Sequence, residues 1–169
     1  MRNKLILDKY WKGYEYMIDI YEVLNKLNIE YQMVEHEEVF TAEQSKHIEN
    51  MIEGVGGKTL FLKDKNNYYL YLLDDERQAN LKFLSKSLNI GRLSFGNEDE
   101  LYDKLKLKKG SVTPLGIIND NSSVILITDK TLKGKKILTH PNINTATVSI
   151  RYDDLIKFIK YCNNTYYEV

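Results

Sequence analysis

This sequence has only one cysteine, no long hydrophobic run and no excess of charge of one sign. Its single cysteine, Cys162, excludes an internal disulfide framework and cannot supply a multi-cysteine zinc site. No apolar run approaches the roughly 18 residues of a membrane span. The N-terminal sequence MRNKLILDKYWKGYEY has its short apolar patch interrupted by charge, unlike a secretory signal. We therefore expect a cytoplasmic protein with no membrane partner.

The charges balance, with 24 basic and 24 acidic residues. A protein that coats a nucleic acid duplex usually carries a basic excess, which releases counterions from phosphates. Any contact with nucleic acid must therefore be local. Lysines do gather in two places, which are either solvated faces or docking points for a phosphate backbone: Lys104, Lys106, Lys108 and Lys109, and Lys133, Lys135 and Lys136.

The chain length of 169 residues fits one domain. Folding at that size buries roughly 70% of the surface of the unfolded chain, so no disulfide or metal is needed for stability. No linker, repeat or low-complexity block divides the sequence. We assign 1–14 to an N-terminal extension and 15–169 to the domain.

Periodicity predicts alternating helices and strands. Thr41 and Gln44, like Asn97 and Glu100, have the spacing of a capping box, and Gly54 suits a helix exit. Four helices are predicted over 15–28, 41–54, 78–88 and 97–107. A fifth helix is predicted after a cap at Asp153 or its neighbour, with the side chains of Leu155, Ile156 and Ile159 directed toward the core. Strands are predicted over 31–36, 58–64, 67–73, 92–95, 123–128, 135–140 and 146–150.

The strands over 58–64 and 67–73 are joined by a short polar stretch, which predicts a hairpin. A hairpin argues against a purely parallel sheet. We therefore predict an α/β (α+β) fold in a single domain, with a mixed, curved sheet and flanking helices.

The segment GVGGKTLFL places Lys58 after a run of glycines, at the predicted opening of a strand. In a phosphate-binding P-loop the glycines lead into a helix instead, so a nucleotide-binding enzyme is disfavoured. From this segment alone, a helix exit followed by a surface lysine is the simpler interpretation.

The loop GSVTPLG, from Gly110 to Gly116, contains Pro114, one of two prolines. Glycines permit close backbone approach, and proline stiffens a turn. Such a loop could direct backbone N–H groups at a carbonyl oxygen that develops negative charge. The alternative is an ordinary turn between a helix and a strand.

The third segment, HPNINTATVSI, starts at His140, and Asn142, Asn144 and Thr145 offer polar groups to a ligand. A lone histidine is more often structural than catalytic, and we assign His36 and His47 to surface or packing roles. No GxSxG elbow, HExxH pair or His/Cys cluster occurs, so we predict no protein nucleophile, metal or cofactor. The carboxylates at Asp74, Asp75 and Glu76 are interpreted as a solvated turn.

Four segments together resemble the YbaK/prolyl-tRNA synthetase-associated editing family, in its order and rough spacing. The segments are EHEEVFTAEQS at 35–45, GGKTLFLKD at 56–64, GSVTPLGIIND at 110–120 and HPNINTATVSI at 140–150. The last two are most similar to its freestanding alanyl-tRNA(Pro) deacylase branch. The resemblance implies an enzyme that hydrolyses the ester between a misplaced amino acid and the acceptor end of tRNA, with tRNA(Pro) as the expected partner.

The resemblance also implies roles for individual residues. It implies that Lys58 is the key functional side chain. We hypothesise that Lys58 orients the terminal adenosine or aminoacyl group and that the N–H groups of Leu115 and Gly116 face the ester carbonyl. His140 and Asn144 would shape the amino-acid pocket. Members of this branch often have Asn where this sequence has Thr59. The remaining residues expected to bind substrate are Thr41, Gly110, Ser111, Pro114 and Thr145.

Two alternatives stay open at this point. The enzyme could remove cysteine or serine instead of alanine, because pocket volume cannot be read from one sequence. The domain could also be a non-catalytic regulator that binds tRNA or another ligand on the same fold.

Overall fold

The structure, a computed structural model, describes residues 18–39 and 41–169 and is built on a mixed sheet. Within these ranges eight strands pair in the order β1-β7-β6-β2-β3-β5-β8, with β4 also pairing with β2. The strands are β1 (Tyr31–Glu35), β2 (Val55–Lys63), β3 (Tyr68–Asp74), β4 (Ser94–Phe95), β5 (Ile125–Thr128), β6 (Lys136–Thr139), β7 (Ala146–Arg151) and β8 (Tyr166–Glu168). The pairs β2–β6, β3–β5 and β5–β8 are parallel, and the others are antiparallel. The predicted mixed sheet is therefore confirmed.

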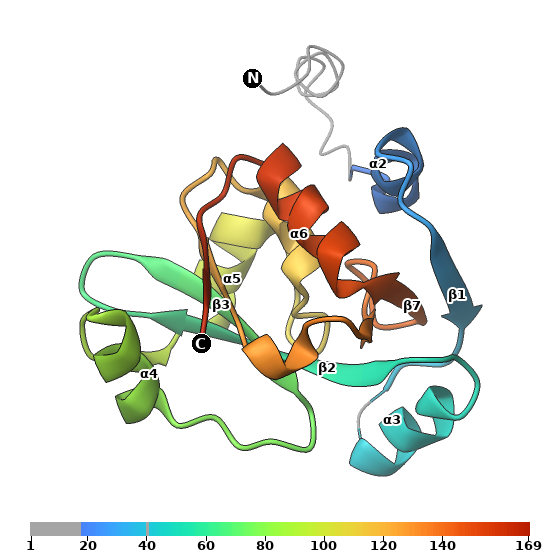
Figure 1. The fold of residues 1–169 in the computed structure, drawn as a ribbon, viewed down its shortest axis with the longest axis horizontal. Helices are drawn as coiled ribbons and strands as arrows, with labels where there is room; N and C mark the ends of the chain where they lie inside the picture. The colour runs from blue at the N-terminus through green and yellow to red at the C-terminus, as the bar shows by residue number, and fades with distance from the viewer. Residues whose placement is uncertain (1–17, 40) are drawn as a thin grey trace.

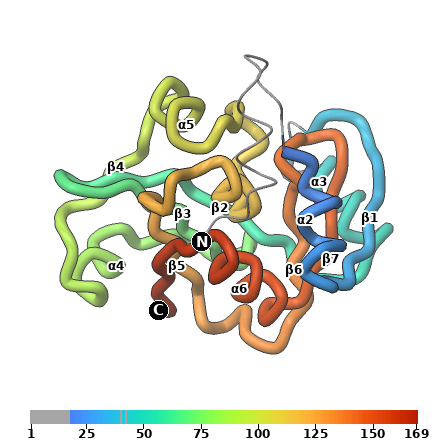
Figure 2. Tube along the Cα trace, turned by 90° about the horizontal axis from the view of Figure 1, so that it is seen from above, coloured from blue at the N-terminus to red at the C-terminus, as the bar shows by residue number. Residues whose placement is uncertain are grey.

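Helices cover both faces of this sheet (Figure 1). They are α2 (Ile20–Lys26), α3 (Ala42–Glu49), α4 (Leu81–Leu88), α5 (Glu98–Leu105) and α6 (Tyr152–Tyr161), with the 3-10 helices η2 (Pro114–Asn119) and η3 (Lys130–Leu132). Figures 1 and 2 agree that α4 and α5 lie toward one end of the sheet and α2 and α3 toward the other. In the part of the chain that the structure describes, no helix is long and apolar enough to cross a membrane.

Two buried clusters define the faces. The larger joins the sheet to α2, α5, η2 and α6, and it includes Leu155, Ile156 and Ile159, which confirms their predicted inward direction. The smaller joins the opposite face to α4 through Leu62, Tyr69 and Leu84. Because successive side chains in a strand point to opposite faces, Lys58 shares its face of β2 with Gly56 and Leu62. Thr59 shares the other face with Phe61.

The local signals in the sequence form the structures expected from them. Asp64 makes the turn of the β2–β3 hairpin, because its Oδ1 accepts the N–H groups of Asn66 and Asn67, both at 2.8 Å. Complete capping boxes form at Thr41 on α3 and at Asn97 on α5. These features depend on neighbouring residues alone.

Two predicted helix boundaries are wrong. Helix α3 ends at Glu49 with Asn50 as its C-cap, so Gly54 is not the helix exit. Gly54 instead lets the chain pass close to β6, since a Cβ there would lie 2.7 Å from Cδ2 of Leu138. Helix α6 follows β7 directly and has no side-chain cap, and its first N–H, of Tyr152, donates to Lys135 O at 2.9 Å. Asp153 therefore lies in the first turn rather than at the cap.

Three further elements were not predicted, and one of them is the 3-10 helix η3. Helix η2 begins at Pro114, whose fixed φ suits a first helical position, and Thr113 accepts the N–H of Leu115 there. Strand β8 pairs in parallel with β5, which lies about forty positions earlier in the chain. Residues 1–14, expected to form an extension, and the predicted start of the first helix at residue 15 lie outside the described residues.

A buried carboxylate fixes the end of η2. Asp120, which is 3% exposed, accepts hydrogen bonds from the N–H groups of Ser123 and Val124, both at 2.7 Å. It also accepts one from the Ser123 hydroxyl and one from Nδ2 of Asn164, both at 2.8 Å. Asp120 therefore ties η2 to the start of β5 and to the turn after α6.

Replacing Asp120 should destabilise the fold. In Asp120→Ala the buried donors of Val124 and Asn164 lose their acceptor, so we expect the free energy of unfolding to fall by about 3 kcal/mol. The measurement is urea denaturation followed by circular dichroism. Asp153→Ala removes an exposed carboxylate from the first turn of α6 and should cost less than about 1 kcal/mol. Equal losses in the two variants would contradict this account of Asp120.

Candidate active site

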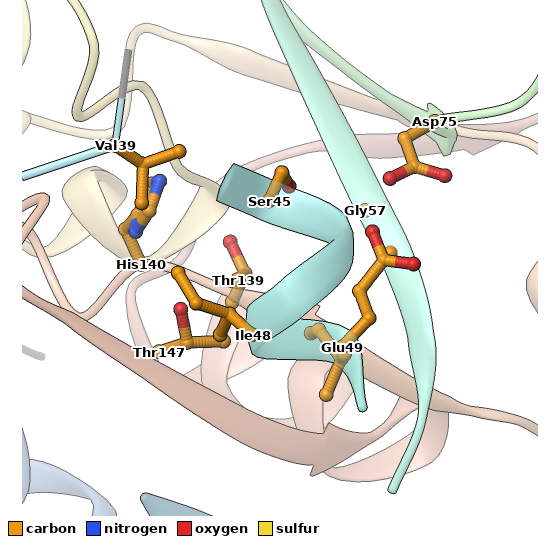
Figure 3. Close-up of a pocket in the computed structure, with 11 residues that line it drawn as sticks. Val39, Ser45, Ile48, Glu49, Gly57, Asp75, Thr139, His140 and Thr147 are labelled. Carbon is orange, nitrogen blue, oxygen red and sulfur yellow. The ribbon is translucent and has the colours of Figure 1, made fainter. Parts of the chain in front are cut away.

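A small cavity of about 60 Å³ lies between α3 and the sheet. Its walls are formed by Val39, Ser45, Ile48, Glu49, Gly56, Gly57, Asp75, Leu138, Thr139, His140 and Thr147. Figure 3 shows Val39 and His140 at one end of the cavity and Glu49 and Asp75 at the other. The cavity therefore combines an apolar wall with an imidazole and two carboxyl groups.

His140 follows the last residue of β6 and is held in one tautomer. Its Nδ1 lies 3.0 Å from the carbonyl oxygen of Ala146, and a carbonyl oxygen can only accept, so Nδ1 carries the hydrogen. The neutral ring then has a lone pair on Nε2. Burial lowers the pKa of His140, and a positive charge on His36 would lower it further, while the hydrogen bond to Ala146 opposes both effects. His140 is therefore held neutral near pH 7.

His36, which the sequence assigned to a surface or packing role, contacts a residue of the cavity wall. Its Nδ1 lies 2.7 Å from Glu37 O, and its Nε2 lies 2.8 Å from the hydroxyl oxygen of Thr147. Thr147 lines the cavity, and the rings of His36 and His140 are 6.3 Å apart. Strands β1 and β7 bring these residues together through pairs such as Glu35↔Ala146, a long-range contact that local patterns do not reveal.

The two carboxyl groups of the cavity lie over Gly56. A Cβ at this position would lie 2.2 Å from Oδ2 of Asp75 and 2.7 Å from Oε1 of Glu49, so only glycine leaves them room. Burial raises the pKa of Glu49 to about 7, and its hydrogen bond to Asp75 and the negative charge there add to this effect. Asp75 thus belongs to the cavity wall and not only to a solvated turn, as its sequence context indicated.

Lys58 lies on the cavity face of the sheet, but its ammonium group points elsewhere. Strand β2 begins at Val55, so the lysine is its fourth residue and does not open the strand as predicted. Gly56 pairs with Leu138 in parallel register, and Lys58 and His140 each follow two positions after their member of this pair. Lys58 and His140 are therefore expected on the same face of the sheet. Nζ of Lys58 donates to Arg77 O at 2.6 Å, and Lys58 is not among the residues that line the cavity.

The loop from Gly110 to Gly116 is joined to the segment that carries His140. The hydroxyl groups of Thr113 and Thr139 are hydrogen bonded at 3.0 Å, and both residues are buried. Nδ2 of Asn142 donates to Leu115 O at 3.5 Å. A Cβ added at Gly110 would lie 3.7 Å from Nδ2 of Asn144. The structure therefore brings together the loop and the His140 segment.

The predicted oxyanion donors are already engaged within the loop. The N–H of Leu115 donates to Oγ1 of Thr113 at 3.3 Å, and the N–H of Gly116 donates to Thr113 O at 3.2 Å. Gly116 also packs so closely on Leu107 that a Cβ would lie 2.5 Å from Cδ1 of that leucine. In this conformation the loop, including buried Pro114, supports the end of β6 and does not present these N–H groups to a ligand.

The remaining predicted residues are dispersed. Thr41 is exposed and caps α3. Oγ1 of Thr59 is buried without a hydrogen-bond partner among the described residues. The N–H of buried Ser111 donates to Lys108 O at 3.0 Å. Thr145 is exposed, and its carbonyl accepts the N–H of His36 at 2.9 Å.

Comparisons with known proteins agree with this architecture. Residues 36–158 match the aminoacyl-tRNA editing domain family. The chain is 39% identical over 149 residues to the prolyl-tRNA editing protein ProX of Acetoanaerobium sticklandii, covering 85% of this chain and 90% of that protein. It is 37% identical over 156 residues to prolyl-tRNA synthetase associated domain-containing protein 1 of Mus musculus, covering 88% and 92% respectively.

The fold also has a match among solved structures. A crystal structure of a candidate trans-editing enzyme for prolyl-tRNA synthetase superposes with a TM-score of 0.67 at 15% identity, covering 91% of this chain and 98% of that chain. That likeness supports the fold, and the sequence matches define the family. The chain therefore belongs to the aminoacyl-tRNA editing domain family and is an aminoacyl-tRNA deacylase.

Proposed function

We propose that this deacylase acts in trans to remove alanine from mischarged tRNA(Pro). The observation that carries the proposal is the size of the cavity beside His140, about 60 Å³. A cavity of about 150 Å³ accepts a benzene ring, so one less than half as large suits a methyl side chain better than a pyrrolidine ring. The names of the ProX protein and the mouse relative, both of which refer to prolyl-tRNA or its synthetase, support the choice of tRNA.

The cavity acts as a sieve by volume. Ile48 and Leu138 are 7% and 4% exposed and form rigid apolar walls. A hydrophobic pocket excludes a larger side chain more strongly than it selects against a smaller one. Alanine therefore enters, while the proline that belongs on tRNA(Pro) is rejected.

His140 assists the hydrolysis through Nε2. A vicinal hydroxyl of the terminal ribose orients a water molecule, and Nε2 takes a proton from that water as its oxygen bonds to the ester carbon. The ester C–O bond then breaks, and the proton passes to the ribose oxygen, which releases free alanine and intact tRNA. The hydrogen bond from Nδ1 to Ala146 holds the ring in the tautomer that this step needs.

Lys58 orients the terminal adenosine. In the free protein its ammonium group donates to a single backbone carbonyl, Arg77 O, which is a weaker partner than a phosphate. The anionic end of the tRNA draws the side chain from Arg77 toward the cavity on the same face of β2. Burial of the ester then strengthens the electrostatic contribution of the lysine.

A panel of four substrates tests the proposal. With alanyl-, cysteinyl-, seryl- and prolyl-tRNA(Pro), we expect the fastest ester loss from the alanyl species and a rate at least about 100-fold lower from the prolyl species. Lys58→Ala should lower the alanyl rate by about 100-fold or more, because it removes the orienting charge. Lys65→Ala, which changes an exposed lysine in the hairpin turn, should leave the rate unchanged. Equal release of all four amino acids would rule out a sieve.

Widening the cavity should relax its selectivity. Ile48→Ala removes the γ- and δ-carbons of a wall residue, so we expect the preference for alanyl over prolyl ester to fall by about tenfold or more. The readout is the ratio of kcat/KM values for the two substrates. Ile52→Ala, which truncates a buried isoleucine that does not line the cavity, controls for loss of stability. An unchanged ratio in Ile48→Ala would place the amino acid elsewhere.

The proposed role of His140 predicts a pH dependence. Because burial lowers its pKa below the ordinary 6.5, the active neutral form persists into mildly acidic solution. We expect kcat/KM to fall about tenfold per pH unit only once the pH drops below that lowered pKa. Nuclear magnetic resonance titration of the imidazole, assigned with His140→Gln, measures the same pKa directly.

Two variants test whether this fall in kcat/KM at acidic pH, the acid limb, is due to His140 and not to another titrating group. His47→Gln changes an exposed histidine on α3 and should leave the limb in place. Glu49→Gln removes the carboxyl group whose pKa is about 7, so a transition due to Glu49 would vanish while the limb of His140 remains. An imidazole of His140 that is charged at pH 7 would refute the role as base.

A further inference from the structure

Charge is distributed unevenly along α5 and the residues that follow it. The acidic residues of 98–109 come first, as Glu98, Asp99, Glu100 and Asp103, and the lysines follow, as Lys104, Lys106, Lys108 and Lys109. We call residues 104–109 the lysine segment. The positive half of this stretch adjoins the loop that starts at Gly110, while the negative half lies at the other end of the helix.

We propose that the lysine segment binds the sugar-phosphate backbone of the tRNA next to its acceptor end. This inference rests on the proposed function, because it supplies the contact that the tRNA body needs while its aminoacyl end enters the cavity. A backbone of closely spaced phosphates releases condensed counterions when lysines neutralise it, which favours binding at a short row of cations.

The position of the segment suits this role. Lys106 ends α5 in a left-handed conformation, with φ 56°, so the chain leaves the helix there. Lys106, Lys108 and Lys109 are all exposed. The segment then runs into Gly110, which lies against Asn144 in the loop that contains His140. A nucleic acid strand that follows the lysines therefore reaches the loop that carries the proposed base.

Aromatic rings accompany two of the lysines. Nζ of Lys104 lies 5.2 Å from the centre of the Tyr68 ring, and Nζ of Lys106 lies 5.1 Å from that of Tyr102. Tyr102 is 42% exposed. Cations beside exposed rings are typical of surfaces that bind phosphates and stack on bases or sugars. The segment thus offers both kinds of contact.

The second lysine group, at Lys133, Lys135 and Lys136, does not share these properties. Lys133 pairs with Glu168 at 2.6 Å, and Lys136 pairs with Glu53 at 3.0 Å. These lysines precede β6 or begin it, whereas His140 follows its other end. The ion pair recorded for the lysine segment, Lys109 with Glu98 at 3.7 Å, is highly exposed and contributes little.

The test compares two triple variants that lose the same charge. The first is Lys104→Gln/Lys106→Gln/Lys108→Gln, and the matched control is Lys133→Gln/Lys135→Gln/Lys136→Gln. Binding of uncharged tRNA(Pro) is measured by fluorescence anisotropy over a range of salt concentrations. We expect the first variant to bind about tenfold or more weakly and to lose about two units from the slope of log Kd against log salt. The control should stay within about twofold of wild type.

A deacylation assay distinguishes an effect on tRNA binding from an effect on ester hydrolysis. The first variant should raise KM for alanyl-tRNA(Pro) with kcat little changed, and it should hydrolyse alanyl-adenosine, which has no tRNA body, at the wild-type rate. Thermal melting confirms that both variants are folded. Equal binding by the two variants, or equal weakening in both, would overturn the proposal. Failure of the wild type to deacylate any substrate would instead refute the proposed function, while the binding arm would still test the surface.

Discussion

The site depends on a short parallel contact between β2 and β6. The two strands pair only at Val55↔Ile137 and Gly56↔Leu138. Glycine permits this approach, because a Cβ at Gly57 would lie 2.9 Å from Leu138 O. The cavity lies against this contact and beneath α3, so its volume depends on how β2 and β6 diverge beyond the contact. Without the contact, His140 would have no fixed position relative to the face of β2.

Burial gives the inside and the outside of the site different electrostatic properties. Inside, desolvation disfavours charge: it lowers the pKa of His140 and raises the pKa of Glu49 to about 7. Outside, Lys106 and Lys108 are exposed and charged. Under the proposed function, the exposed lysines would face the polyanionic body of the tRNA and the cavity would take the small aminoacyl group. Contact with nucleic acid would then be local, which is compatible with a chain of no net charge.

The features that sequence alone predicted are the local ones. The capping boxes at Thr41 and Asn97 and the turn at Asp64 involve residues within three positions of each other. The contacts that were missed join distant segments. His36 reaches Thr147 across 111 positions, and β8 pairs with β5 only once α6 has turned the chain back. Loop Gly110–Gly116 was located correctly, but Pro114 begins a helix there because Thr113 caps it. The role of Lys58 stays a prediction, since its direction depends on Arg77.

The end of β6 joins the loop Gly110–Gly116 to the cavity. Thr139, the last residue of β6, is hydrogen bonded to Thr113 of the loop, and both Thr139 and the next residue, His140, line the cavity. Because the two residues are adjacent in the chain, the bond that fixes Thr139 also restricts the position of His140. Breaking the buried hydrogen bond between the hydroxyl groups of Thr113 and Thr139 is costly, because a buried polar group that loses its partner destabilises the fold. The loop therefore supports the site indirectly: by holding Thr139 it fixes the end of β6, where the imidazole of His140 borders the cavity.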